Sequence, residues 1–160
     1  MSLRKGGART GPNPVDRGRP GSKRHVLTDA RGVPLAIALI GAHVHDSKVF
    51  EDLIDSIVPV KGKRGKPRRR PEKLHADKGY DFPRCRRFLR KRSIKARIAR
   101  RGVESSETLG RHRWVVERTL TWLSRCRRLC VRYERRADIH EASLVLCCAL
   151  ICLNYLRHAF

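Results

Sequence analysis

The sequence predicts an α/β domain in which helices pack on a mixed sheet. The chain has 160 residues, of which 40% are hydrophobic, enough for one domain with a buried core. Stretches with the two-residue period of strands alternate along the chain with stretches of helical period. Gly- and Pro-rich segments separate these stretches. The predicted order is therefore strand, strand, helix, strand, helix, strand, helix, helix.

The chain begins with a segment rich in Gly, Pro and Arg, residues 1–21, which we expect to be irregular or ordered only by a partner; residues 22–160 form the domain. A hairpin follows, with one strand over about 23–28, a turn over 29–32 and a second strand that ends near Ile40. The second strand ends in a continuous apolar run. Such a run is typical of a strand that is covered on both faces.

Helical spacing starts after the hairpin. The apolar residues between Val49 and Val58 recur on one helix face, Asp46 or Ser47 is the expected cap, and Pro59 ends the helix. The next segment, residues 61–73, has eight basic side chains and one acid. It is either a solvated loop or a loop that faces phosphate groups.

The second half of the chain begins with a short strand that ends at Asp77. A helix over about 83–92 follows, with Pro in its first turn, and then an alternating, half-buried edge strand near 94–98. A long helix is predicted over about 110–130 and a final apolar helix over about 138–156. Its longest uncharged stretch, residues 142–156, is too short to span a bilayer comfortably, and we interpret it as a buried helix.

The charge points to a polyanionic partner. The chain has 38 Lys and Arg against 15 Asp and Glu, a formal net charge of +23. Nucleic acid is the expected partner; acidic membrane is the second choice, because no basic amphipathic helix with an aromatic anchor is present. The N-terminus has no apolar core of a signal peptide. The six cysteines form no Cys-x-x-Cys pair, and we interpret them as small buried hydrophobes in a reducing cytosol.

Two carboxylates stand out in this cationic chain. Asp77 follows a strand directly, and Glu117 lies in the middle of the long helix between apolar residues. Each has an ordinary explanation: Asp77 makes a turn, and Glu117 pairs with Arg113 one helical turn away. Together they also fit phosphodiester chemistry, in which two Mg²⁺ ions about 3.5–4 Å apart are held by carboxylates from different elements. Spacing alone leaves both interpretations open.

Other candidate groups favour structural roles. His43 and His45 precede Asp46 in a metal-like pattern, but a loop that leads into a helix cap explains them better. His75 alternates with Asp77 on one strand face and either supports it or belongs to the core. Trp114 and Trp122 are eight residues apart on the long helix, which favours core packing over base stacking.

Longer motifs carry a family resemblance. "HADKGYD" around Asp77 and "HRWVVERTLTWLSRCRRLCVRYE" around Glu117 resemble the second and third acidic signatures of bacterial DDE insertion-sequence transposases, the IS-five group in particular. "GRPGSKRHVLTDARGVPLAIALIGAHVHDS" resembles the early hairpin of the same family, and the match covers about residues 5–155. The resemblance implies an RNase H-like fold, Mg²⁺ or Mn²⁺ as cofactor, and cleavage and strand transfer of double-stranded DNA at transposon ends. It also implies a homodimer, no membrane partner and a cytoplasmic, nucleoid-associated location.

The resemblance assigns roles to single residues. Asp77 becomes the second acid of the catalytic triad and Glu117 the third, both as metal ligands. Four basic residues become DNA contacts: Arg113, Lys78, Arg118 and Arg125. Arg113 occupies the arginine position of the family's Tyr-Arg-Glu-Lys signature. The tyrosine and lysine positions hold Gly110 and Ser124, with Arg125 next to the latter.

The first acid of the triad has no good match. The resemblance places it on a strand just upstream of "RKGGARTGPNP". The remaining candidates, Asp16, Asp29, Asp46 and Asp81, lie in a Pro/Gly-rich segment, in a hairpin turn or at helix caps. We therefore expect a catalytic domain that is truncated at its N-terminus, lacks its first, central strand and is inactive alone. The alternative is a non-catalytic, basic nucleic-acid-binding protein with a steep salt dependence.

Overall fold

The computed structural model describes residues 7–62, 64–100 and 106–158, with side chains of the last range described from Trp114 onward. The chain divides into two compact units. Unit 1 comprises Met1–His45 and Val115–Phe160, and unit 2 comprises Asp46–Trp114. The prediction of one domain over 22–160 stays a prediction, and each unit is described by itself below.

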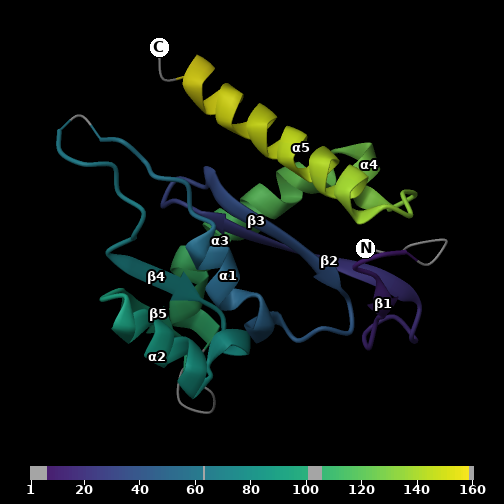
Figure 1. The fold of residues 1–160 in the computed structure, drawn as a ribbon, viewed down its shortest axis with the longest axis horizontal. Coiled ribbons are helices and arrows are strands. Elements are labelled where there is room, and N and C mark those ends of the chain that lie inside the picture. The colour runs from purple at the N-terminus through teal and green to yellow at the C-terminus, as the bar shows by residue number, and fades with distance from the viewer. Residues whose placement is uncertain (1–6, 63, 101–105, 159–160) are drawn as a thin grey trace. The chain divides into compact units, whose positions relative to one another are not determined.

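Unit 1 contains a three-stranded antiparallel sheet with the order β1-β2-β3 (Figure 1). The strands are β1 (Gly11–Pro12), β2 (Pro20–Thr28) and β3 (Pro34–Gly41). The predicted hairpin is confirmed: Val26 lies opposite Ile37, and the register shifts next to the turn, between Leu27 and Thr28. The segment expected to be irregular differs from the prediction, because β1 pairs with the start of β2.

The hairpin turn shows why Asp29 and Gly32 stand in it. Oδ1 of Asp29 accepts hydrogen bonds from the backbone N–H groups of Arg31 (2.8 Å) and Val33 (2.9 Å), so its role is local, as predicted. Gly32 has φ +92°. A Cβ there would lie 2.9 Å from Oγ1 of Thr119, whose hydroxyl donates to the Gly32 carbonyl at 2.8 Å. The position therefore requires glycine.

Three helices complete the C-terminal part: α3 (Ser106–Ser124), α4 (Arg127–Cys130) and α5 (Ala137–Arg157). The single helix predicted over 110–130 is wrong in two ways, because α3 begins earlier and a break separates it from α4. At the break, the N–H groups of Arg125 and Cys126 bond to carbonyls three residues back, and Cys126 then turns to an extended ψ of 111°. This tightening ends the α-helical ladder.

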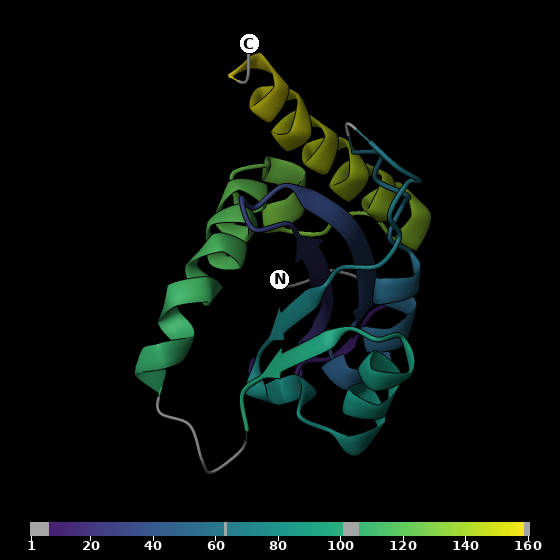
Figure 2. The ribbon, with the colours of Figure 1, turned by 90° about the vertical axis from the view of Figure 1, so that its left-hand side faces the viewer.

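The core of unit 1 lies where α5 packs near the end of α3 and against α4 and β3. α5 lies over the β2–β3 hairpin and contacts β3 (Figures 1 and 2). The buried cluster consists of Leu123, Leu129, Leu144, Cys148 and Ile151. All six cysteines are free, as expected, and Cys85 and Cys148 are buried. Cys130 is exposed, so the interpretation of every cysteine as a buried hydrophobe is wrong there.

The prediction that α5 is a buried helix is wrong for one of its faces. Large apolar residues on this face are exposed: Ile139, Val145, Leu146, Leu150, Leu153 and Leu156. The sequence shows that α5 has apolar residues on all sides of the helix, but it does not show which elements cover them. By length and composition alone α5 could also cross a membrane, a property that many core helices share. Most of β3 is likewise half-buried rather than covered on both faces.

Among its described residues, unit 2 contains two parallel strands, two complete α-helices and the first part of α3. In chain order its elements are η1 (Asp46–Lys48), α1 (Phe50–Asp55), β4 (Lys73–Ala76), η2 (Lys78–Tyr80), α2 (Pro83–Lys91) and β5 (Lys95–Ile98). β4 pairs with β5, and Leu74 lies opposite Ala96. In the described ranges the strands thus form two small sheets and not the single mixed sheet that was predicted.

The helices of unit 2 partly follow the predictions. Pro83 stands in the first turn of α2, as expected. The predicted cap by Asp46 or Ser47 is wrong for α1, because both residues belong to η1 and Val49 occupies the N-cap. α1 also ends at Asp55, which leaves Val58 exposed. Asp81 does not cap α2; it pairs with Arg86 instead.

Candidate active site and nucleic-acid interface

Asp77 lies where β4 ends, as predicted. Its backbone is still extended (φ −72°, ψ 164°), and its side chain is exposed. Oδ1 accepts a hydrogen bond from the Lys78 backbone N–H at 2.7 Å, so Asp77 caps the one-turn helix η2. The turn role and a ligand role are compatible, because one carboxylate has two oxygens with several acceptor sites.

A second acid lies on the same side of unit 2. Burial, followed by the negative charges of Asp46 and Asp77, raises the pKa of Tyr80 above its ordinary value. Both carboxylates therefore act on the same phenol, whose ring packs against Phe50 with 5.3 Å between ring centroids. η1 and η2 are in contact, so both acids lie in the neighbourhood of Tyr80. The sequence interpretation favoured a helix cap for Asp46 over its metal-like pattern with His43 and His45, although Asp46 lies in the "HVHDS" end of the hairpin motif.

Carboxylate oxygens at the ends of β4 and η1 suit a hard divalent cation. Within either unit, however, no three His, Cys, Asp or Glu side chains among the described residues group closely enough to hold a metal ion. Asp46 and Asp77 therefore offer the right donor chemistry as a pair, without forming a complete metal centre inside unit 2.

Glu117 lies in the middle of α3 and is exposed. Thr119, two residues on, faces the other way and is fully buried. The carbonyl of Glu117 accepts a hydrogen bond from the Thr121 hydroxyl at 2.8 Å. Glu117 belongs to unit 1 and Asp77 to unit 2. That the two acids share a metal ion stays a prediction.

Arg118, one of the predicted DNA contacts, has intramolecular partners. Its Nη2 donates to the hydroxyl of Tyr155 at 3.1 Å and to the carbonyl of Arg31. Its guanidinium carbon lies 4.9 Å from the centre of the Trp122 ring. These contacts join α3 to α5 and to the β2–β3 turn. A DNA contact from Arg118 stays a prediction.

The three other residues predicted to contact DNA lie in different parts of the chain. Lys78 is half-buried in η2, next to Asp77, and Arg125 is exposed between α3 and α4. The side chain of Arg113 lies outside the described residues.

Three aromatic and imidazole groups singled out in the sequence agree with the predictions to different degrees. His75 is exposed, so it is not a core residue. Trp114 is 51% exposed, and its interpretation as core packing is wrong. Trp122 is half-buried against Tyr155 and the core cluster, as predicted.

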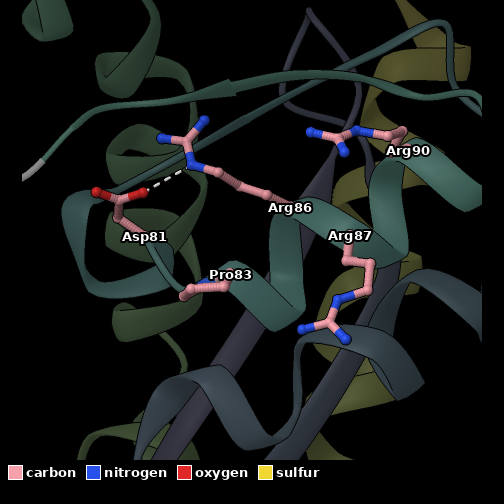
Figure 3. A pocket seen from close by; sticks show the side chains of 5 residues that line it. All are labelled: Asp81, Pro83, Arg86, Arg87 and Arg90. Carbon is pink, nitrogen blue, oxygen red and sulfur yellow. Dashed lines mark hydrogen bonds and ion pairs between the residues drawn. The ribbon is translucent and has the colours of Figure 1, made fainter.

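The basic helix α2 borders an open pocket of about 570 Å³, lined by Asp81, Pro83, Arg86, Arg87 and Arg90 (Figure 3). Asp81 holds Arg86 through an ion pair of 2.7 Å, and Nη2 of Arg86 also donates to the Ile98 carbonyl at 2.9 Å. Arg87 and Arg90 are exposed and form no ion pair within the described part of the chain. Their positive charges are therefore available to an anionic partner.

Other arginines of this region are already compensated. Arg84 pairs with Glu51 at 3.1 Å, and Arg92, just after α2, pairs with Asp55 at 2.6 Å. The sequence showed a run of basic residues over 84–101 but not which of them have acidic partners. The structure narrows the candidate phosphate contacts of the pocket to Arg87 and Arg90.

Comparison with known proteins agrees with these features. A family model described as "Transposase DDE domain" matches residues 2–152. A protein named as the transposase for insertion sequence element IS402, from Burkholderia cepacia, is 56% identical over 158 residues, which cover 99% of this chain and 75% of that protein. No solved structure matches the chain. DDE transposases have an RNase H-like fold, generally use divalent metal ions and act on DNA. The chain belongs to the DDE transposase family.

Proposed function

We propose that this chain is a catalytic-domain segment of a DNA transposase that cleaves and joins strands at transposon ends. The family match over residues 2–152 supports this proposal, with Asp77 at the end of β4 and Glu117 in the middle of α3. A strand end and a late helix are the positions that the resemblance implies for these acids, which supports the proposal. We propose that the protein acts on the bacterial nucleoid, in the cytoplasm.

Asp77 and Glu117 are the residues that would hold Mg²⁺ or Mn²⁺. Bound divalent ions in such a site activate the attacking oxygen and stabilise the leaving oxygen of a phosphodiester. Residues 1–160 by themselves contain two of the three matching acids. We therefore expect them to bind a divalent ion weakly and to bind DNA without cutting it.

DNA binding rests on basic residues around these acids. Lys78, Arg113, Arg118 and Arg125 are the contacts that the resemblance implies. Arg87 and Arg90 add a patch on α2 that carries uncompensated charge. Phosphate contacts of this kind give affinity that does not depend on sequence and falls with salt.

Titration with Mn²⁺, followed by electron paramagnetic resonance, tests the assignment of the acids. We expect Asp77→Asn and Glu117→Gln each to weaken Mn²⁺ binding by about tenfold or more, equivalent to ~1.4 kcal/mol of lost ligation. If both acids hold one ion, the double variant binds little worse than either single variant. Asp52→Asn, at an exposed acid of α1, is the matched control and keeps wild-type binding.

Wild-type affinity in Asp77→Asn or Glu117→Gln would contradict the shared site, as would fully additive losses. Activity has its own test: the chain preceded by an Asp-bearing strand should nick supercoiled DNA only with Mg²⁺ or Mn²⁺. Nicking that survives Asp77→Ala and Glu117→Ala would remove their catalytic roles.

A second candidate is a non-catalytic nucleic-acid-binding protein, which the net charge of +23 favours. In that case DNA affinity would show the same steep salt dependence, but Mn²⁺ would change neither affinity nor product. The titration above therefore separates the two functions.

A further inference from the structure

α5 carries a regular apolar row on its exposed face. The row consists of Ile139, Ala142, Leu146, Ala149, Leu153 and Leu156. Its spacing alternates between three and four residues, which is the a/d pattern of a coiled-coil seam. The four large residues are 44–64% exposed, and both alanines are exposed as well.

The opposite face of α5 is already used. His140, Leu144, Cys148 and Ile151 are buried in unit 1. A surface helix of a globular protein needs one such apolar face, and α5 has two. The described part of unit 1 covers only the first.

The exposed row is complementary to itself when two copies run antiparallel. With the symmetry axis between Cys147 and Cys148, Leu146 lies opposite Ala149 of the second copy and Leu153 opposite Ala142. Ile139 then faces Leu156. In the four central layers of the seam, a large residue thus packs against an alanine of the other copy. This alternation fills space as interdigitated packing requires. A parallel pair would instead stack leucine on leucine and leave gaps at the alanine layers.

The charges of α5 also favour a second copy over DNA. The chain has a net charge of +23, yet residues 137–156 contain no Lys or Arg. Two copies can therefore meet at this face without the repulsion that the rest of the surface produces. The antiparallel alignment places Asp138 level with Arg157 of the second copy, and it sets each helix N-terminus beside the other's C-terminus.

We propose that the exposed face of α5 binds the same face of a second copy in an antiparallel, two-fold symmetric helix pair. Such an interface is isologous, because the same patch serves both subunits. The seam is about 26 Å long, from the helical rise per residue. We expect a single helix pair of this length to lie at the small end of specific interfaces, which begin at roughly 1,200 Å² in total, and therefore expect reversible association. The proposal does not depend on catalysis.

Analytical ultracentrifugation of the chain over a wide concentration range, in high salt and without DNA, tests the proposal. We expect a reversible dimer for the wild type and a monomer for Leu146→Glu, which places a charge in the seam. Val58→Glu is the matched control: it alters a similarly exposed apolar residue (68% against 64%) in unit 2 and should dimerise as the wild type does. Circular dichroism verifies that both variants keep their helices.

A double variant tests the direction of the pair. In the antiparallel arrangement Leu146→Glu with Ala149→Lys places each new acid opposite a new lysine, so dimerisation returns. A parallel arrangement would place like charges together and keep the chain monomeric. A wild type that stays monomeric at every concentration, or a Leu146→Glu variant that still dimerises, would overturn the proposal. So would a monomeric wild type that floats with lipid vesicles through this face.

Discussion

Arg132 is the most deeply buried charged side chain described in this protein, with 0% exposure. Its guanidinium donates six hydrogen bonds, which tie the N-terminal segment and β2 to the segment before α5. The closest acceptors are Oγ of Ser22 at 2.7 Å and the carbonyl of Ala8 at 2.8 Å. Burial lowers the pKa of Arg132 from its ordinary value, and the nearby Glu134 opposes that shift.

We expect Arg132→Ala to cost about 3–5 kcal/mol of unfolding free energy. Removal of one partner from a buried charged network typically costs this much, because the acceptors stay buried without their donor. For a chain of this length each kcal/mol lowers Tm by roughly 2–4 °C, so the expected drop is roughly 6–20 °C. Arg132→Lys keeps the charge but reaches fewer acceptors, and its loss should be intermediate.

Urea unfolding and thermal unfolding, both followed by circular dichroism, measure these losses. Arg135→Ala is the matched control, since it removes the same charge from an exposed position three residues away. We expect that control to lie within about 0.5 kcal/mol of the wild type. If Arg132→Ala loses no more stability than Arg135→Ala, the network does not stabilise unit 1 and the reasoning is refuted.

Three further predictions concern charge, protonation and the hairpin turn. Replacing both Arg87 and Arg90 by Ala should reduce the slope of log K against log salt for binding to duplex DNA by about 2, because two phosphate contacts are lost. Fluorescence anisotropy measures this slope, and an unchanged slope would show that these two arginines do not contact DNA phosphates. Burial raises the pKa of Cys147 to about 12 and that of Cys148 to about 11. Thiols of the unfolded chain ionise near pH 9, whereas the folded protein keeps these two protonated. The free energy of unfolding should therefore fall as pH rises from about 9 to 11, and fall less steeply in Cys147→Ala and Cys148→Ala; equal slopes of this free energy against pH in wild type and variants would contradict the prediction. Gly32→Ala should cost about 1–3 kcal/mol in urea unfolding, because its φ is +92° and Thr119 is close; a neutral result would contradict the strain.

Local signals in the sequence predicted much of the fold. Asp29 and Gly32 marked the hairpin turn, and Pro83 marked the start of α2, because these residues act through their own backbone. The strand that ends at Asp77 was predicted from the strand-like stretch Lys-Leu-His-Ala before it.

Features that depend on distant neighbours, or on local backbone geometry that the composition does not report, could not be predicted. The break between α3 and α4 depends on backbone bonds at Arg125 and Cys126, in a stretch whose composition is helical throughout. Asp46 acts on Tyr80 only because η1 meets η2 in space. The exposure of Leu146 depends on what packs against α5, and no period in the sequence reports that.

The central claim is that Asp77 and Glu117 hold one divalent ion. Fe²⁺ in place of Mg²⁺, on addition of hydrogen peroxide, is oxidised to Fe³⁺ while the peroxide is reduced to hydroxide and a hydroxyl radical, which cuts the polypeptide backbone close to the bound ion. The account predicts cuts in two separate segments, around residue 77 and around residue 117, both of which disappear in Asp77→Ala. Cuts confined to the neighbourhood of Asp77 that persist in Glu117→Ala would contradict it.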